Sequence, residues 1–395
     1  MKNVCFLITV MTGGGAERVV SVLSNELVER GFRVTIFIIH QPLSLAQTDS
    51  INSQVKIISV QDETKSTNNN TIKHIKTIKA RFVRKIPHRF REEKYLIDRY
   101  KIRYYEKVKY LKNYFSRHPQ TVSIAFLYDA MYMALLSANK DTRVIISERG
   151  DPRQCLTSRT NLAFFNTMFA RADEMVFQSF DAMQWYKENT NVEGRIIFNP
   201  VQPGLPERYS GIRQKKVVNF CRISSQKNLR LLISAFSQFA KNYPDYQLYI
   251  YGDAVGSDSE GYVEIINEYV QSLVCKDKIH IIPAQKDIHE LIKDYAMFVS
   301  SSDFEGMSNS MLEAMAIGLP TICTDCPAGG ARAIIKDHEN GILVPVDDVQ
   351  AMVNAMKEVA GDPELAEKLS VNGTKIREEL SVDKIVNQWM EIING

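Results

Sequence analysis

Two long stretches of this chain repeat one alternation, in which short apolar runs are separated by amphipathic helical segments. The first stretch opens with an apolar run at residues 4–8, a helical pattern over 16–30 and a second apolar run at 34–39. Apolar runs that are joined by a helix and lack a polar alternation indicate parallel strands with both faces covered. Such a chain is constrained to an α/β fold with a helix between successive parallel strands.

The alternation continues on both sides of a proline-rich segment at 199–206. In the first half we predict further strands at 122–127, 144–146, 175–177 and 195–198, and helices at 130–138 and 158–171. In the second half the predicted strands are 216–220, 247–251, 279–282, 297–300, 321–323 and 341–344, and the predicted helices are 228–242, 260–273, 288–294, 309–317, 348–360 and 364–372. We expect two doubly wound, Rossmann-like parallel-sheet domains that face a central cleft. The expected parts are domains 1–199 and 200–378, and a last helix in 379–395 that packs back on the first domain.

Composition, cysteine usage and the length of the apolar runs indicate the class of protein and its cellular compartment. The 395 residues are 45% hydrophobic and 24% charged, so both domains can bury a core. Six cysteines without a disulfide spacing favour a reduced, cytosolic compartment, and the CxxC pair Cys323 and Cys326 is interpreted as structural. The N-terminal apolar run is far shorter than the roughly 20 residues that cross a bilayer. We expect a cytoplasmic protein that lies on the inner face of the cell membrane without crossing it.

The net charge of +3 conceals one strongly basic segment, residues 65–117, with 17 lysines and arginines against four acids. Its cations are interleaved with Ile, Phe, Tyr and Leu, which is typical of basic amphipathic helices on anionic membranes. We predict a helical insertion in the first domain that binds an anionic membrane surface, and a solvated helical hairpin is the alternative. Nucleic acid is not expected as a partner, because no recognised nucleic-acid module accompanies this charge.

A glycine-rich loop, Gly13-Gly14-Gly15 followed by Glu17, separates the first predicted strand from the first helix. The N–H groups of Gly14 and Gly15 could approach a phosphate at the helix N-terminus. The loop lacks the GxGxxG spacing, and His40 stands where a dinucleotide site would need an acid after the second strand. A tight strand-to-helix turn is an equally good interpretation.

Two cations follow the first strand of the second domain. Arg222 and Lys227 are five residues apart in a loop that opens a helix. A planar guanidinium together with a lysine point charge suits the binding of a diphosphate. Taken alone, the loop is also compatible with a solvated basic turn.

The strongest pattern covers residues 300–320. Glu305 lies in the loop at the carboxyl end of a strand, and Glu313 lies one turn into a helix that begins near Ser308 or Asn309. N–H groups of the first helical turn favour a phosphate, and carboxylates suit sugar and ribose hydroxyls. The alternatives are a capping acid for Glu305 and a solvent-facing helix residue for Glu313.

Glu305 and Glu313 together form a Glu-x7-Glu motif that resembles the motif of the large retaining glycosyltransferase family 4, which has the GT-B fold. The two cations, the glycine loop and the stretch from Pro327 to Val344 also resemble that family. The resemblance covers nearly the whole chain apart from 65–117.

The resemblance implies a role for each matching residue. Arg222 and Lys227 would hold the donor diphosphate, Glu313 would bind the ribose, and Glu305 would contact the transferred sugar and support the reacting centre. The predicted catalytic residues are Glu305, Arg222 and Lys227. Lys286 and Ile288 are expected in the loop that holds the base. The residues expected to complete the cradle for phosphate and sugar are Gly14, Gly15, Gly306, Met307, Ser308 and Asn309.

One position departs from the family. Many relatives carry a His at the end of a late strand of the first domain, where this chain reads Ser-Glu-Arg-Gly-Asp-Pro over 147–152. Glu148 or Arg149 could face the same space, and with Asp129 they are the acceptor-side candidates. An inverting enzyme would need a carboxylate base among Asp129, Glu148 and Asp151. This form resembles a subset that acts on lipid-linked oligosaccharides or on bacterial surface polysaccharides such as the lipopolysaccharide O-antigen and capsule.

The resemblance implies a metal-independent hexosyltransferase, in which the two cations act in place of a metal ion and no cofactor is needed. It would move a hexose or N-acetylhexosamine from a nucleotide diphosphate sugar, with UDP as the nucleotide, to a polyprenyl-diphosphate-linked glycan with retention of configuration. A nucleotide-sugar epimerase and an inactive sugar-nucleotide-binding subunit are the alternatives.

Overall fold

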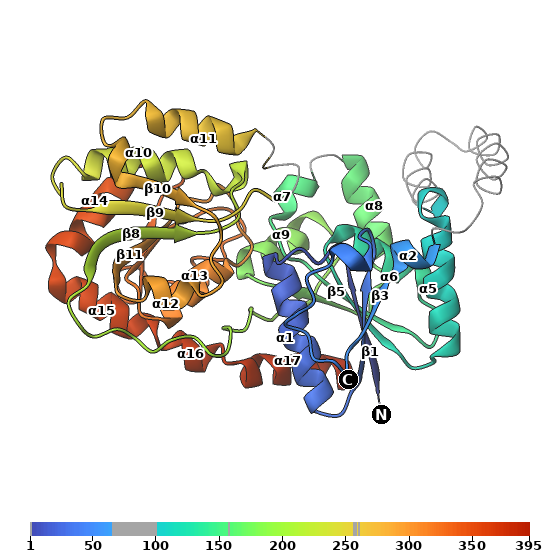
Figure 1. The fold of residues 1–395 in the computed structure, drawn as a ribbon. Coiled ribbons are helices and arrows are strands. Elements are labelled where there is room, and N and C mark those ends of the chain that lie inside the picture. The colour runs from blue at the N-terminus through green and yellow to red at the C-terminus, as the bar shows by residue number, and fades with distance from the viewer. Residues whose placement is uncertain (1, 65–100, 157–158, 256–258, 260) are drawn as a thin grey trace. The chain divides into compact units, whose positions relative to one another are not determined.

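A computed structural model describes residues 2–64, 101–156, 159–255, 259 and 261–395 of the chain. The chain forms two compact units (Figure 1). Unit 1 comprises Met1–Ile197 and Val386–Gly395, and unit 2 comprises Phe198–Ile385. Most of the predicted helical insertion, residues 65–100, lies outside the described residues.

Unit 1 contains a seven-stranded parallel sheet in the order β3-β2-β1-β4-β5-β6-β7. The strands are β1 (Asn3–Ile8), β2 (Arg33–Ile38), β3 (Lys56–Ser59), β4 (Val122–Phe126), β5 (Arg143–Ser147), β6 (Glu174–Phe177) and β7 (Arg195–Ile196). After β1, the chain places β2 and β3 on one side of that strand, and then β4 to β7 on its other side. The direction of winding therefore reverses between β1 and β4, and such a switch point opens a crevice at the carboxyl ends of the strands.

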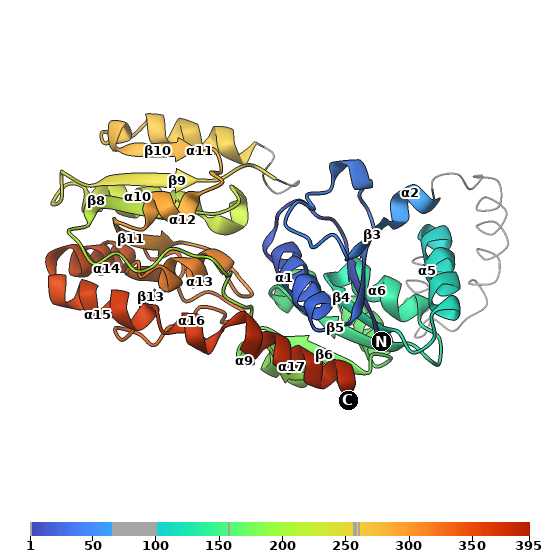
Figure 2. The same cartoon turned by 60° about the horizontal axis from the view of Figure 1, so that its bottom comes forward.

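Helices cover both faces of this sheet, as a parallel sheet requires. The helical segments are α1 (Gly15–Glu29), η1 (Leu43–Leu45), α2 (Val60–Thr64), α5 (Tyr105–Arg117), α6 (Tyr128–Ser137), α7 (Pro152–Cys155), α8 (Arg159–Phe169), α9 (Phe180–Asn189) and α17 (Val382–Asn394), of which α17 enters unit 1 at Val386. The end of α17 lies beside α1, and α5, α6 and α8 lie on the other face (Figures 1 and 2). Trp389 anchors α17, because it is 1% exposed and its ring stacks on Phe126 with centroids 5.9 Å apart.

Unit 2 contains a six-stranded parallel sheet in the order β10-β9-β8-β11-β12-β13. The strands are β8 (Gln214–Phe220), β9 (Gln247–Tyr251), β10 (Ile279–Ile282), β11 (Tyr295–Ser300), β12 (Thr321–Thr324) and β13 (Ile342–Val344). Its winding reverses between β8 and β11, which makes the loops after these two strands the switch point of unit 2.

The helices of unit 2 also form two layers. They are η2 (Ser225–Lys227), α10 (Leu229–Phe239), α11 (Tyr262–Gln271), η4 (Lys276–Lys278), α12 (Ile288–Ile292), α13 (Asn309–Ala316), α14 (Val349–Gly361), α15 (Pro363–Gly373) and α16 (Ile376–Glu379). Figures 1 and 2 show α10 on one face of the sheet and α12 and α13 on the other. Apolar side chains of α10, α11 and α14 share one buried core with the sheet.

The predicted fold class is confirmed, since both units are Rossmann-like α/β folds around a parallel sheet. The elements that were not predicted are β3, α9 and the short helical segments η1, α2, α7, η2, η4 and α16. The strand β3 has only four residues, and α9 mixes polar and aromatic residues without a clear apolar stripe. Among the described helices, none has the length and apolar character needed to cross a membrane.

Candidate active site

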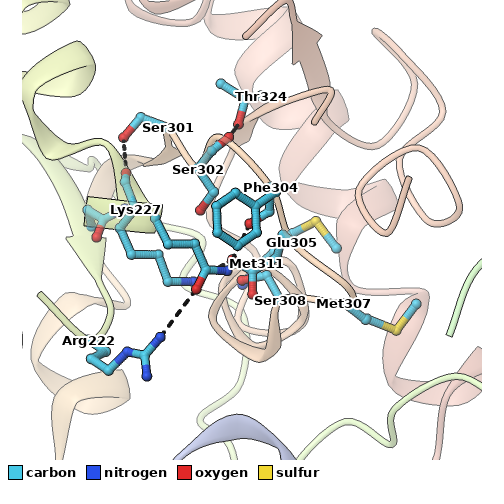
Figure 3. A network of polar contacts seen from close by, with 12 residues as sticks. Arg222, Lys227, Ser301, Ser302, Phe304, Glu305, Met307, Ser308, Met311 and Thr324 are labelled. Carbon is cyan, nitrogen blue, oxygen red and sulfur yellow. Dashed lines mark hydrogen bonds and ion pairs between the residues drawn. The ribbon is translucent and has the colours of Figure 1, made fainter. Parts of the chain in front are cut away.

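The three predicted catalytic residues, all in unit 2, come from the two loops at its switch point (Figure 3). Arg222 and Lys227 follow β8, and Glu305 follows β11. Since β8 and β11 are neighbouring parallel strands, their loops leave the sheet side by side at its carboxyl edge. Residues almost 80 positions apart in the sequence are thereby brought into contact.

Asn228 holds the β8 loop in place. It adopts the left-handed conformation with φ of 40°, where Asn is tolerated better than most residues, and its side chain caps α10. Its side-chain amide also donates to Asp303 at 2.6 Å and to Asp347 at 3.0 Å. From the β11 side, the Ser301 hydroxyl donates to the carbonyl of Lys227 at 2.9 Å. These bonds fix the two loops relative to each other.

The centre of the site is an ion pair between Lys227 and Glu305, whose Nζ and Oε2 atoms are 2.5 Å apart. Only 14% of the Lys227 side chain and 19% of the Glu305 side chain are exposed. Burial alone would lower the pKa of Lys227, but the adjacent Glu305 carboxylate outweighs it and the pKa is raised. Lys227 is therefore a fixed positive charge across the physiological pH range.

Gln226 connects this pair to Arg222. Its side-chain amide donates to the carbonyl of Phe304 at 2.8 Å, and its oxygen accepts from Nη2 of Arg222 at 3.2 Å. Arg222 is exposed, whereas Lys227 is partly buried. The two predicted cations thus share one loop, with one directed to solvent and the other held by Glu305.

Glu313 lies on α13 and is 3% exposed, so it is not the solvent-facing residue of the alternative interpretation. Its Oε2 contacts Nε2 of His289 on α12 at 2.9 Å. The ring of His289 packs edge-on against Phe220, with centroids 5.7 Å apart. This carboxylate is held in a fixed orientation at the same edge of the sheet.

The helix α13 begins directly after the Glu305 loop. Ser308 is its N-cap and accepts from the N–H of Met311 at 3.3 Å. Asn199 donates to the Asn309 side chain at 2.8 Å, which ties the helix start to the proline-rich segment. The predicted helix start at Ser308 or Asn309 is where the structure has it.

A close backbone approach shapes the same loop. A Cβ atom on Gly330 would lie 1.4 Å from the carbonyl oxygen of Gly306, so only glycine fits there.

Of the two residues predicted to hold the base, Ile288 is buried at the start of α12 and Lys286 is exposed.

The predicted glycine loop belongs to unit 1. The N–H groups of Gly14 and Thr12 donate to the Glu17 carboxylate, at 2.8 and 2.5 Å. Glu17 thus satisfies the Gly14 amide, one of the two that were expected to face a phosphate. A part for Gly14 and Gly15 in donor binding stays a prediction.

Glu148 follows β5 and is 3% exposed. One carboxylate oxygen accepts from the hydroxyls of Tyr128 and Tyr186 at 2.5 and 2.6 Å, and the other accepts from the N–H groups of Arg149 and Gly150 at 2.9 Å. Burial raises its pKa even though these bonds oppose the rise. Glu148 organises the loop after β5 from inside the unit.

Arg149 is partly buried. Its guanidinium lies 4.0 Å from the ring centroid of Phe126 and 5.8 Å from that of Trp389, and burial lowers its pKa to about 9. Asp129, the third acceptor-side candidate, lies in the first turn of α6 and contacts His40 at 3.1 Å. A role of any of the three toward an acceptor stays a prediction.

Sequence reasoning did not assign Gln226, Asn228 or His289 to the site. Gln226 and Asn228 flank Lys227, and His289 follows Ile288, so all three adjoin residues that were singled out. Their partners are distant in sequence, and no local pattern marks them. Over the described parts of the chain, no group of three or more His, Cys, Asp or Glu side chains could hold a metal ion.

Two units of this kind, each a parallel α/β sheet, define the GT-B class of folds. HepE of Anabaena, solved in complex with UDP-glucose, superposes with a TM-score of 0.78 at 16% sequence identity, and all of both chains is covered. At this identity the likeness establishes the fold.

Residues 210–376 match the family described as glycosyl transferases group 1, and this region lies within unit 2 and contains the Lys227–Glu305 pair. An uncharacterized glycosyltransferase of Haemophilus influenzae is 26% identical over 197 residues, which are 50% of this chain and 54% of the relative. The match therefore spans about half the length of that relative.

A third similar protein, from Campylobacter jejuni, is the N-acetylgalactosamine-N,N'-diacetylbacillosaminyl-diphospho-undecaprenol 4-alpha-N-acetylgalactosaminyltransferase. It is 25% identical over 277 residues, which are 66% of this chain and 72% of the relative. Together the family match and these relatives support a glycosyltransferase with the GT-B fold.

Proposed function

We propose that this protein transfers a hexose or N-acetylhexosamine from UDP to a growing bacterial glycan carried on a polyprenyl diphosphate. The observation that carries the proposal is the Lys227–Glu305 pair, with Arg222 on the same loop, at the switch point of unit 2. Its chemistry suits an anionic leaving group beside a polyhydroxylated sugar. The Campylobacter relative is named for transfer to a diphospho-undecaprenol acceptor, and HepE was solved with UDP-glucose.

In this proposal unit 2 holds the donor. Arg222 and Lys227 offset the negative charge that grows on the UDP leaving group, and the N-terminus of α13 adds backbone N–H groups at Met307 and Ser308. Glu305 contacts the transferred sugar and also keeps Lys227 charged. The remaining donor contacts are those expected from the family: Gly306 and Asn309 in the cradle, Glu313 at the ribose, Lys286 and Ile288 at the base, and Gly14 and Gly15 at the phosphates.

Transfer proceeds with retention and without a metal ion. The bond between the anomeric carbon and the phosphate oxygen breaks, and a bond from that carbon to the acceptor oxygen forms on the same face. The departing phosphate oxygen takes the proton of the acceptor hydroxyl, so no protein base is needed. NMR of the product's anomeric proton tests this step, and an inverted configuration would instead require a carboxylate base in unit 1.

The reaction itself is tested with the full chain, a panel of UDP-sugars and lipid-linked glycans. We expect one UDP-sugar to release UDP only when an acceptor is present, and mass spectrometry to find the lipid-linked glycan heavier by one sugar. Interconversion of the UDP-sugar without an acceptor would identify an epimerase instead. Absence of turnover in all combinations, with UDP still bound, would identify a binding subunit.

The protein is proposed to act on the cytoplasmic face of the membrane, where α5 provides part of the contact. One face of α5 is buried through Val108, Leu111 and Phe115, and the other exposes Lys109 and Lys112. Cations near an anionic surface contribute about 1 kcal/mol each.

Flotation with liposomes tests this contact. We expect the protein to float with vesicles that contain anionic lipid and to sediment with neutral ones. Lys109→Glu combined with Lys112→Glu should reduce flotation, and the control Lys140→Glu with Lys187→Glu, two exposed lysines elsewhere in unit 1, should not. Flotation that is indifferent to lipid charge would contradict membrane docking through α5.

A further inference from the structure

Unit 1 carries a polar cluster at its own switch point. His40 lies two residues beyond the end of β2, and Asp129 lies in the first turn of α6, directly after β4. Both strands pair with β1, so the two side chains flank the carboxyl end of β1. This is the edge at which open α/β sheets bind ligands.

The cluster is held together by a chain of contacts. Nε2 of His40 lies 3.1 Å from Oδ2 of Asp129, and the Tyr104 hydroxyl lies 3.5 Å from the same oxygen. On the other side of the imidazole, Nζ of Lys107 lies 2.7 Å from Nδ1 and 2.5 Å from the carbonyl oxygen of Ile39. Since an ammonium can only donate, Nδ1 accepts and Nε2 carries the proton that is donated to Asp129.

The carboxylate of this cluster is accessible, unlike that of Glu148. Asp129 exposes 31% of its side chain and His40 exposes 21%, whereas Glu148 is 3% exposed. Burial lowers the pKa of Lys107 to about 8, although Asp129 opposes this shift. The lysine is thus partly buried behind the imidazole, while the carboxylate reaches solvent.

We infer that Asp129 accepts a hydrogen bond from a hydroxyl group of the acceptor sugar, and that His40, Tyr104 and Lys107 are positioning residues that fix its orientation. This inference rests on the proposed function, because it names the group that would bind the acceptor in unit 1. A carboxylate that is already oriented by the donors His40 and Tyr104 can accept a hydrogen bond from a sugar hydroxyl without first changing its orientation. Glu148 supports the neighbouring loop from within the unit, where it accepts from the N–H groups of Arg149 and Gly150.

Saturation-transfer NMR with the full chain tests the inference. The probes are the methyl glycosides of glucose, galactose, N-acetylglucosamine and N-acetylgalactosamine, each added in the presence of UDP. We expect at least one glycoside to bind the wild type, and Asp129→Asn to weaken it about tenfold, which is the loss of one hydrogen bond to a charged group. The control is Asp141→Asn, an exposed aspartate in the turn before β5, which should bind as the wild type does.

The positioning role of Lys107 has a separate readout. In the wild type, the ¹⁵N shifts of His40 should show a protonated Nε2 and an unprotonated Nδ1. Lys107→Met should shift this tautomer balance and weaken glycoside binding, and Lys107→Arg, which retains a donor, should restore both. A tautomer that is unchanged in Lys107→Met would contradict the positioning role.

The outcomes separate this inference from the proposed function. UDP binding by the same samples reports the donor site, and we expect Asp129→Asn to leave it unchanged. Glycoside binding that is equal in Asp129→Asn and the wild type, or absent from the wild type for all four probes, overturns the inference while UDP binding persists. Failure of the wild type to bind UDP would count against the proposed function instead.

Discussion

Replacing Lys227 with methionine should destabilise unit 2 by about 3 kcal/mol, because it leaves the Glu305 carboxylate without its cation in a largely buried site. The loss should appear in urea unfolding followed by circular dichroism. Both tryptophans, Trp185 and Trp389, belong to unit 1, so their fluorescence provides an internal reference for that unit. Sugar transfer should be lost together with stability.

A double variant separates the two losses. Lys227→Met with Glu305→Gln removes the unpaired charge, and we expect it to recover most of the stability but none of the transfer activity. Lys241→Met, the same substitution at an exposed lysine of unit 2, serves as the control and should unfold like the wild type. If Lys227→Met were as stable as Lys241→Met, the pair would not hold the two loops together.

Arg222→Ala should impair donor binding and catalysis without lowering stability. Arg222 is exposed, so its loss should leave the unfolding midpoint unchanged. Loss of a group that stabilises developing charge costs roughly 3–4 kcal/mol of transition-state stabilisation, and we therefore expect kcat to fall by about a hundredfold to a thousandfold. Steady-state UDP release in the presence of acceptor measures this effect.

The matched control for Arg222→Ala is Arg230→Ala. Arg230 is an exposed arginine of α10 that lies over the ring of Tyr269 at 4.9 Å and is not among the predicted donor residues. It should retain wild-type turnover. Near-normal turnover of Arg222→Ala would remove the residue from the catalytic set, even if the rest of the site remained as proposed.

The alternation of strands and helices made the fold predictable, because a parallel sheet covered on both faces leaves a strong apolar signal in each strand. The rule that ligands bind at strand ends also placed Arg222, Lys227 and Glu305 at one edge of one sheet. Elements with a weak signal were not found. The four residues of β3 and the polar helix α9 are defined by packing against the rest of unit 1 rather than by their own pattern.

Pairings between distant residues were not predictable. Nothing near Lys227 indicates that its partner is Glu305 rather than a ligand, and nothing near Glu313 indicates His289. Nothing near Glu148, one of the acceptor-side candidates, indicates that two tyrosine hydroxyls from α6 and α9 donate to its carboxylate. Such contacts depend on the tertiary fold, which one sequence does not encode locally.

The central claim is that the switch point of unit 2 binds the diphosphate of a UDP-sugar, and calorimetric titration of UDP tests it most directly. We predict that the wild type and Arg230→Ala bind one UDP per chain with equal affinity. Arg222→Ala should bind at least about tenfold more weakly, the loss expected for one charge-assisted hydrogen bond. Absence of UDP binding by the wild type, or equal binding by Arg222→Ala, would contradict the claim.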